Sequence, residues 1–219
     1  MIKKIIFDFD GVLVDSEILA AKAFSEYFNK HNISFSEKEF STFAGKKTIE
    51  VIEELSKKFE ILNKEDFFND IINITNNIYE TNLTAVIGAE SFLEKANLNY
   101  FIGSNSVKER ILTGLKKVNF DRFFSDEKVY SFDMVKKAKP EPDIYLTAIE
   151  SNKLNIKETI IIEDSVIGVK AGFNAGVKVI GLTAGEHWYK ERSANELKYA
   201  GASLLIDSYD KLLNELKNL

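Results

Sequence analysis

The sequence predicts an α/β fold, a Rossmann-like parallel sheet core with an inserted α-helical cap domain. Residues 1–15 and 83–219 alternate short apolar runs with amphipathic stretches, which is typical of a parallel sheet with helices on both faces. Residues 16–82 show helical periodicity and hold no convincing strand. We therefore expect the two outer segments to form one α/β core and the inner segment to form a helical domain inserted into it.

The expected strands of the core are short apolar runs, namely Ile2–Asp8, Tyr100–Ser104, Thr159–Glu163, Val177–Leu182 and Ser203–Ile206. Helical periodicity fills the gaps between them, for example at Ser106–Lys117, Pro142–Asn152 and Ser165–Ala175. The insert directly follows the first strand, and its apolar spacing predicts about four helices.

Composition narrows the class of protein. The chain has 219 residues, of which 45% are hydrophobic, and this suits one domain with a modest insert. The net charge of −5 gives no support for a nucleic-acid surface. The chain has no cysteine, which excludes disulfides, zinc–thiolate sites and thiol nucleophiles.

The N-terminal segment does not resemble a targeting signal. Lys3 and Lys4 are followed only by Ile5-Ile6-Phe7 before Asp8, which is far too short for a signal-peptide core. No apolar run approaches the length of a membrane span. We expect a soluble, cytoplasmic protein with no membrane partner, and the sequence leaves its oligomeric state open.

The first motif is Asp8-Phe9-Asp10-Gly11, at the carboxyl end of the first strand, where open α/β sheets bind ligands. Asp8 and Asp10 have the same parity on an extended backbone, and their paired charges need a cation or a proton nearby. Gly11 permits a tight turn. One interpretation makes Asp8 a covalent nucleophile and Asp10 a general acid and then base. The alternative, a helix N-cap or a solvated loop, suits Asp15 and Ser16.

The second motif is Ser104-Asn105, where a strand ends and a helix is expected to follow. Backbone N–H groups at a helix start bind anions, and the Ser104 hydroxyl adds a donor. Ordinary capping by Ser104 or Asn105 is the alternative.

The third motif is Lys139, which precedes Pro140 and stands close to Pro142. A proline holds its predecessor in an extended conformation, so Lys139 is expected to be fixed in place. A fixed ammonium beside paired carboxylates limits their repulsion and grips a phosphoryl oxygen. The alternative is a solvated lysine.

The fourth motif is Glu163-Asp164, at the end of another apolar strand. Magnesium typically binds one or two carboxylates together with water and phosphate oxygens. Asp8, Asp164 and the backbone carbonyl of Asp10 can supply such a set, while Glu163 either adds a ligand or holds Lys139. The alternative is an acid at a helix N-terminus.

The order of these motifs resembles the haloacid dehalogenase superfamily over nearly the whole chain, and most of all its β-phosphoglucomutase-like sugar-phosphate phosphatases. By that resemblance, the protein is a Mg²⁺-dependent phosphatase of small phosphate monoesters. Asp8 takes the phosphoryl group, Asp10 protonates the leaving alcohol, and Mg²⁺ bridges Asp8 and Asp164 to the phosphate. The residues expected to hold the phosphate are Asp8, Gly11, Ser104, Asn105 and Lys139.

Departures from the family pattern leave two other functions open. The presence of Asp10 disfavours the dehalogenases, whose nucleophile lacks this second acid. Mutase members carry a cap histidine and a cap arginine, where this chain has Ala20-Ala21 and Thr48. The alternatives to hydrolysis are a phosphosugar mutase and a non-catalytic phosphosugar-binding protein.

Two groups of residues remain. Lys46 and Lys47 are candidate contacts for an anionic substrate, and a solvated helix start is the alternative. His31 and His187 have no partner at metal-ligand spacing, and His187 is expected in a polar loop beside Trp188.

Overall fold

The computed structural model describes residues 1–43, 46–190 and 192–218. Within them, six parallel strands form one sheet in the order β3-β2-β1-β4-β5-β6. The strands are β1 (Lys4–Phe7), β2 (Asn99–Ser104), β3 (Val129–Ser131), β4 (Thr159–Glu163), β5 (Lys178–Leu182) and β6 (Leu204–Ile206). The predicted fold class, a parallel α/β core with an inserted helical cap, is confirmed.

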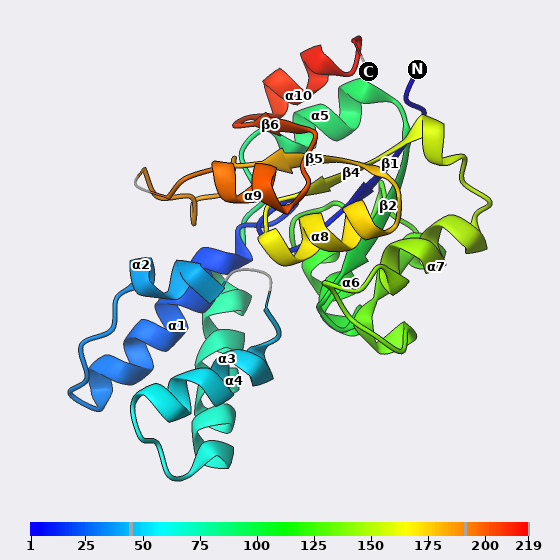
Figure 1. Cartoon of the computed structure of the whole chain (residues 1–219). Helices are drawn as coiled ribbons and strands as arrows, with labels where there is room; N and C mark the ends of the chain where they lie inside the picture. The colour runs from blue at the N-terminus through cyan, green and yellow to red at the C-terminus, as the bar shows by residue number, and fades with distance from the viewer. Residues whose placement is uncertain (44–45, 191, 219) are drawn as a thin grey trace.

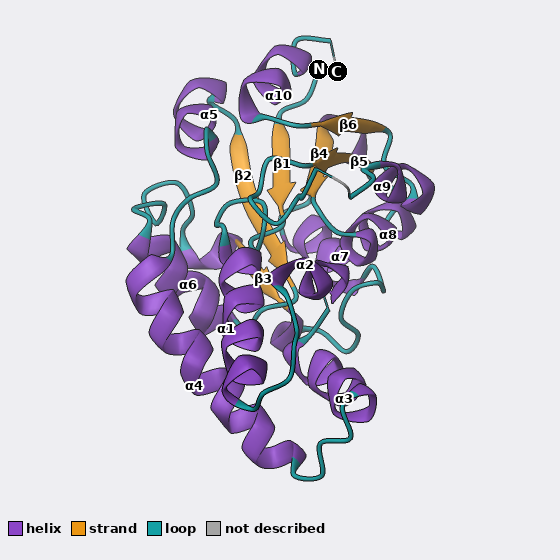
Figure 2. Ribbon diagram, turned by 90° about the vertical axis from the view of Figure 1, so that its left-hand side faces the viewer, coloured by secondary structure: helices purple, strands orange, loops and turns teal. Residues whose placement is uncertain are grey.

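Helices cover both faces of the sheet (Figure 2). Side chains of β1 alternate between the two faces, so Ile5 and Phe7 join one apolar cluster and Ile6 joins the other. The first face is covered by α5 (Ala89–Ala96), α6 (Lys108–Lys117) and α10 (Tyr209–Glu215), and the second by α7 (Asp143–Ser151), α8 (Val166–Asn174) and α9 (Asn195–Ala200).

The insert forms a separate helical layer beyond the carboxyl ends of the strands (Figure 1). Its α-helices are α1 (Ser16–Lys30), α2 (Glu37–Phe40), α3 (Thr48–Lys58) and α4 (Lys64–Asn82). They enclose a third apolar cluster, in which the rings of Phe24 and Phe28 both pack against the ring of Phe67. This aromatic cluster gives the cap a core of its own.

The chain passes between the two parts at neighbouring points. Val14 forms an antiparallel bridge with Ala85, and the Asp15 N–H donates to the carbonyl of Thr84. The exact domain boundaries, 15/16 and 82/83, stay a prediction. None of the described helices combines the length and the apolar character that a membrane span requires.

The structure adds elements that the sequence pattern did not predict. Strand β3 has three residues at the edge of the sheet, too few to display a period of two. Helix α6 starts at Lys108, two residues after the expected Ser106. Its N-cap position is Val107, so neither Ser104 nor Asn105 caps this helix.

Candidate active site

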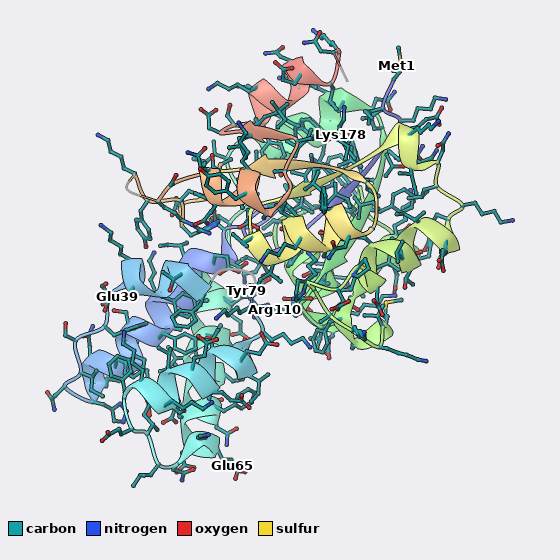
Figure 3. The ribbon with its side chains drawn as sticks, in the orientation of Figure 1. Met1, Glu39, Glu65, Tyr79, Arg110 and Lys178 are labelled. Atoms are coloured by element: carbon teal, nitrogen blue, oxygen red, sulfur yellow. The ribbon has the colours of Figure 1, made fainter. Side chains whose placement is uncertain are left out.

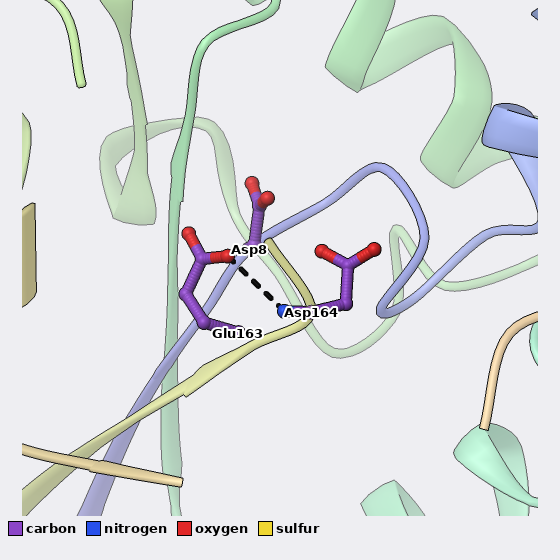
Figure 4. A group of neighbouring side chains, drawn as sticks. All are labelled: Asp8, Glu163 and Asp164. Carbon is purple, nitrogen blue, oxygen red and sulfur yellow. Dashed lines mark hydrogen bonds between the residues drawn. The ribbon is translucent and has the colours of Figure 1, made fainter. Parts of the chain in front are cut away.

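The parallel register brings the ends of β1 and β4 together. Phe7 lies opposite Ile162 in the ladder, so the residues that follow these two emerge at the same edge of the sheet. Figure 4 shows the result, with the side chains of Asp8, Glu163 and Asp164 converging from two strands. One carboxylate oxygen from each lies within 4.8 Å of the others.

This acidic cluster is buried and short of positive charge. Asp8, Glu163 and Asp164 are 6%, 0% and 1% exposed. Burial, followed by the charge of Glu163, raises the pKa of both Asp8 and Asp164 well above the usual value for aspartate. Asp164 Oδ2 is buried and has no hydrogen-bond partner. An oxygen-only donor set with excess negative charge and an unpaired oxygen fits a hard divalent cation.

Lys139 is the ammonium closest to the cluster. Its Nζ lies 2.6 Å from Glu163 Oε1 and 3.0 Å from Asp8 Oδ1. Tyr145 also donates its hydroxyl to Glu163 Oε1, at 2.6 Å, while Glu163 Oε2 accepts from the backbone N–H groups of the next two residues. Both oxygens of Glu163 are therefore engaged by protein donors, which favours its expected role of holding Lys139 over metal ligation.

Ser104 and Asn105 lie beside Lys139 and Asp10. The Asn105 side chain accepts from the backbone N–H of Lys139 at 3.0 Å and donates to its carbonyl at 3.4 Å. These two bonds fix the Lys139 backbone, so the lysine is immobilised by an amide as well as by its proline neighbour. The Ser104 hydroxyl is 3.5 Å from Asp10 Oδ2.

Gly11 makes room for the acidic cluster. Its φ is +74°, and a Cβ at this position would lie 2.1 Å from Asp164 Oδ2 and 3.0 Å from the His187 ring. A side chain is excluded here both by the backbone conformation and by the close approach of Asp164.

Asp10 points to a different set of donors. The Ser16 hydroxyl donates to its Oδ1 and the Ser106 hydroxyl to its Oδ2, each at 2.6 Å, and Arg110 Nη2 lies 3.3 Å from Oδ1. The capping interpretation of Ser16 is therefore wrong. Asp15 occupies the N-cap position of α1 without a side-chain cap bond, and instead accepts from the backbone of Glu186 at 2.9 Å.

His187 was expected in a polar loop without a partner, but the structure places it only 2% exposed and close to Asp164. Its Nε2 lies 2.9 Å from Asp164 Oδ2, although the two atoms lack hydrogen-bond geometry. Burial lowers the pKa of His187 to about 4. The available signal was its position after an apolar strand, at the edge of the sheet where the other site residues gather.

A cavity of about 870 Å³ separates the cap from these residues. Asp8, Asp10 and Lys139 lie on its core side. Lys46 and Lys47 line it from the cap; Lys46 forms an ion pair with Glu54, and the ammonium of Lys47 lies 4.8 Å from the centre of the Phe132 ring. The cavity therefore joins the acidic cluster to both predicted cap lysines.

Comparison with known proteins gives a consistent family. The model of the haloacid dehalogenase-like hydrolases matches residues 5–182. The chain is 27% identical to 6-phosphogluconate phosphatase of Escherichia coli over 188 residues, 85% of each chain. It is 30% identical to hexitol phosphatase A of Escherichia coli over 189 residues, 83% of each chain. A solved haloacid dehalogenase-like protein of Agrobacterium tumefaciens superposes with a TM-score of 0.90 at 28% identity, covering 100% of this chain and 99% of its own.

Proposed function

The chain belongs to the haloacid dehalogenase-like hydrolase family and is a phosphoric monoester hydrolase, and we propose that it hydrolyses small sugar phosphates with Mg²⁺ and an aspartyl-phosphate intermediate. One observation carries the proposal. Two aspartates, Asp8 and Asp10, face one cavity with different partners, the first among acids and an ammonium and the second among hydroxyls and a guanidinium. Such separation suits one carboxylate for attack and another for proton transfer.

The first chemical step forms a bond between an Asp8 oxygen and phosphorus while the bond from phosphorus to the sugar oxygen breaks. Asp10, in its protonated form, gives its proton to that oxygen, and the sugar leaves as a neutral alcohol. In the second step Asp10 takes a proton from water as the water oxygen attacks phosphorus. Inorganic phosphate leaves, Asp8 is restored as a carboxylate, and Asp10 is protonated for the next turnover.

Asp8 and Asp164, with the backbone carbonyl of Asp10, would hold Mg²⁺. The cation supplies charge neutralisation for the phosphoryl oxygens and for the carboxylates around them. The N–H and hydroxyl donors of Ser104 and Asn105 and the ammonium of Lys139 are proposed to bind the same oxygens. The burial of Lys139 and its pairing with Glu163 support this assignment, because the ammonium is held where the phosphate is expected.

The cavity and the relatives support a sugar phosphate as the substrate class. A cavity of about 870 Å³ is large enough for a six-carbon phosphate ester. Lys46 and Lys47 are proposed to contact its distal end, since both line the cavity from the cap. Two similar proteins, 6-phosphogluconate phosphatase and hexitol phosphatase A, are named after phosphate esters of this chemical class.

Hydrolysis is favoured over the mutase reaction by the cap. Ala20 and Thr48 line the cavity. By the resemblance to the family, mutase members carry a histidine at about Ala20-Ala21 and an arginine at Thr48. A mutase must retain its phosphorylated intermediate and return the phosphoryl group to sugar. Product analysis separates the two reactions, because hydrolysis releases inorganic phosphate and yields no phosphate-transfer isomer.

The test is a panel of sugar phosphates, phosphoglycolate and nucleotides, assayed with and without Mg²⁺. We expect Mg²⁺-dependent phosphate release that is abolished in Asp8→Asn, while the fold stays nearly intact by circular dichroism. Asp207→Asn, which changes an exposed aspartate paired with Lys211, is the matched control and should keep full activity. Wild-type rates in Asp8→Asn would refute the covalent step, and the absence of turnover across the panel would favour a binding protein.

A further inference from the structure

Arg110 lies between the acid–base carboxylate and the cap. It belongs to helix α6 of the core, yet its guanidinium carbon lies 4.7 Å from the ring centre of Tyr79, on cap helix α4. Figure 3 labels this pair where the lower helical layer meets the core. On its other side, Nη2 lies 3.3 Å from Asp10 Oδ1. One side chain thus contacts both the proposed proton donor and the cap.

The side chain of Tyr79 packs against helix α6 at Gly114. A Cβ on Gly114 would lie 2.5 Å from the Tyr79 hydroxyl and 2.6 Å from the ring of Phe9, so only glycine admits the tyrosine here. Gly114 and Arg110 are four residues apart and share one face of α6. That face presents a gap for the hydroxyl end of Tyr79 and a cation for its ring.

Tyr79 also stands at the last turn of α4, just before the chain returns to the core. The N–H of Leu83 donates to the Tyr79 carbonyl at 3.3 Å, and the described bridge between Val14 and Ala85 follows directly. Tyr79 therefore lies at the end of α4 that is bonded next to the core, and there it offers its ring as a platform for Arg110.

The other donors to Asp10 do not fix its orientation in the same way. Ser16, Ser106 and the more distant Ser104 bind through hydroxyls, which rotate freely and donate or accept as needed. A guanidinium is planar and donates only in fixed directions. Arg110 is the fully charged, directional donor among these four, and its side chain is about one-third exposed, to the cavity that it lines.

We propose that Arg110 is a positioning residue, which holds the Asp10 carboxyl in line with the leaving oxygen and uses Tyr79 as its platform. This inference rests on the proposed phosphatase function. It assigns Arg110 a part in proton transfer rather than in binding the phosphate, since its contacts are with Asp10 and not with the acidic cluster of Asp8.

Leaving-group chemistry separates this role from a structural one. A sugar alcohol needs a proton from Asp10 as it leaves, whereas p-nitrophenolate leaves readily without one. Both esters give the same phosphorylated Asp8, so the second step is common to them. Measurements with enzyme in excess over ester follow the first step alone and are the appropriate assay.

We expect Arg110→Ala to lower the first-step rate with glucose 6-phosphate or the most active sugar phosphate of the panel by about 10- to 100-fold, and with p-nitrophenyl phosphate by less than about threefold. KM should change little. Arg110→Lys should recover part of the first-step rate. Tyr79→Leu should, like Arg110→Ala, lower the rate with the sugar phosphate more than the rate with p-nitrophenyl phosphate. Tyr79→Phe should resemble wild type, because it keeps the ring that the Arg110 guanidinium contacts.

Arg122→Ala is the matched control, since Arg122 is an exposed arginine of the core that pairs with Glu90 and Glu94. Equal losses with both esters in Arg110→Ala, or a rise in KM at unchanged kcat, overturn the inference while leaving the phosphatase function standing. A wild-type protein inactive on both esters overturns the proposed function and this inference together. Melting curves of Arg110→Lys confirm that the comparison is made on folded protein.

Discussion

Lys139 and Glu163 form a buried ion pair, with Nζ 2.6 Å from Oε1 and side chains that are 2% and 0% exposed. The same ammonium lies 3.0 Å from Asp8 Oδ1. Asp8 and Glu163 therefore share one ammonium beside a third buried acid, Asp164, and the loss of that ammonium leaves uncompensated charge in a low-dielectric environment.

We predict that Lys139→Met lowers the free energy of unfolding by about 3–5 kcal/mol at neutral pH without Mg²⁺. Urea denaturation measures this difference. Lys178→Met is the control, because Lys178 is exposed at the start of β5, and its cost should be below about 0.5 kcal/mol. A loss in Lys139→Met no larger than that of the control would contradict the electrostatic account. Turnover should also be lost, since the ammonium is proposed to bind the phosphate.

The contact of His187 with Asp164 leads to a prediction on cation affinity. Both side chains are buried, and His187 Nε2 lies 2.9 Å from Asp164 Oδ2. Loss of a residue that orients a metal-binding side chain typically weakens the affinity for the metal by about 10- to 100-fold. We expect His187→Phe, which keeps a ring and removes both nitrogens, to weaken Mg²⁺ or Mn²⁺ binding by about tenfold in calorimetry. His31→Phe, at the end of cap helix α1, is the control. An unchanged dissociation constant in His187→Phe would remove this role.

Two glycines allow backbone strain to be separated from the shape of the site. Gly11 and Gly176 both have φ of +74°, but a Cβ on Gly176 meets no atom within 4 Å, whereas one on Gly11 meets Asp164 Oδ2 at 2.1 Å. Both alanine variants should cost about 1–2 kcal/mol for the left-handed conformation. Only Gly11→Ala should also lose turnover and the rise in melting temperature that we expect from Mg²⁺. Equal activity in the two variants would show that Asp164 moves aside without harm.

The sequence predicted those parts of the site that follow from local patterns. Asp8 and Glu163-Asp164 end strongly apolar strands, and the parallel register of β1 and β4 then brings the acids together. Arg110 and His187 were missed because their partners are distant in sequence, Asp10 by 100 residues in the case of Arg110. Such contacts depend on how helices and loops pack, which a single amphipathic pattern does not encode.

The raised pKa values of Asp8 and Asp164 predict how pH and Mg²⁺ act together. A carboxyl whose pKa is raised by folding favours the folded state most below its unfolded pKa of about 3.9. That contribution is lost as pH rises through the higher folded values, because the folded state then holds two ionised, buried carboxylates. Without a cation, this part of the stability of the protein therefore decreases as pH rises above about 4.

Mg²⁺ is proposed to bind the ionised carboxylates, so protons should compete with it and its stabilising effect should grow with pH. At one fixed Mg²⁺ concentration, we expect the gain in melting temperature to be small at about pH 5 and to increase steadily towards pH 8. Asp164→Asn should remove most of the gain at every pH, whereas the exposed Asp207→Asn should leave it unchanged. A gain that is the same at both ends of the range would mean that the cation binds carboxylates already ionised at low pH, and the buried cluster would not be its site.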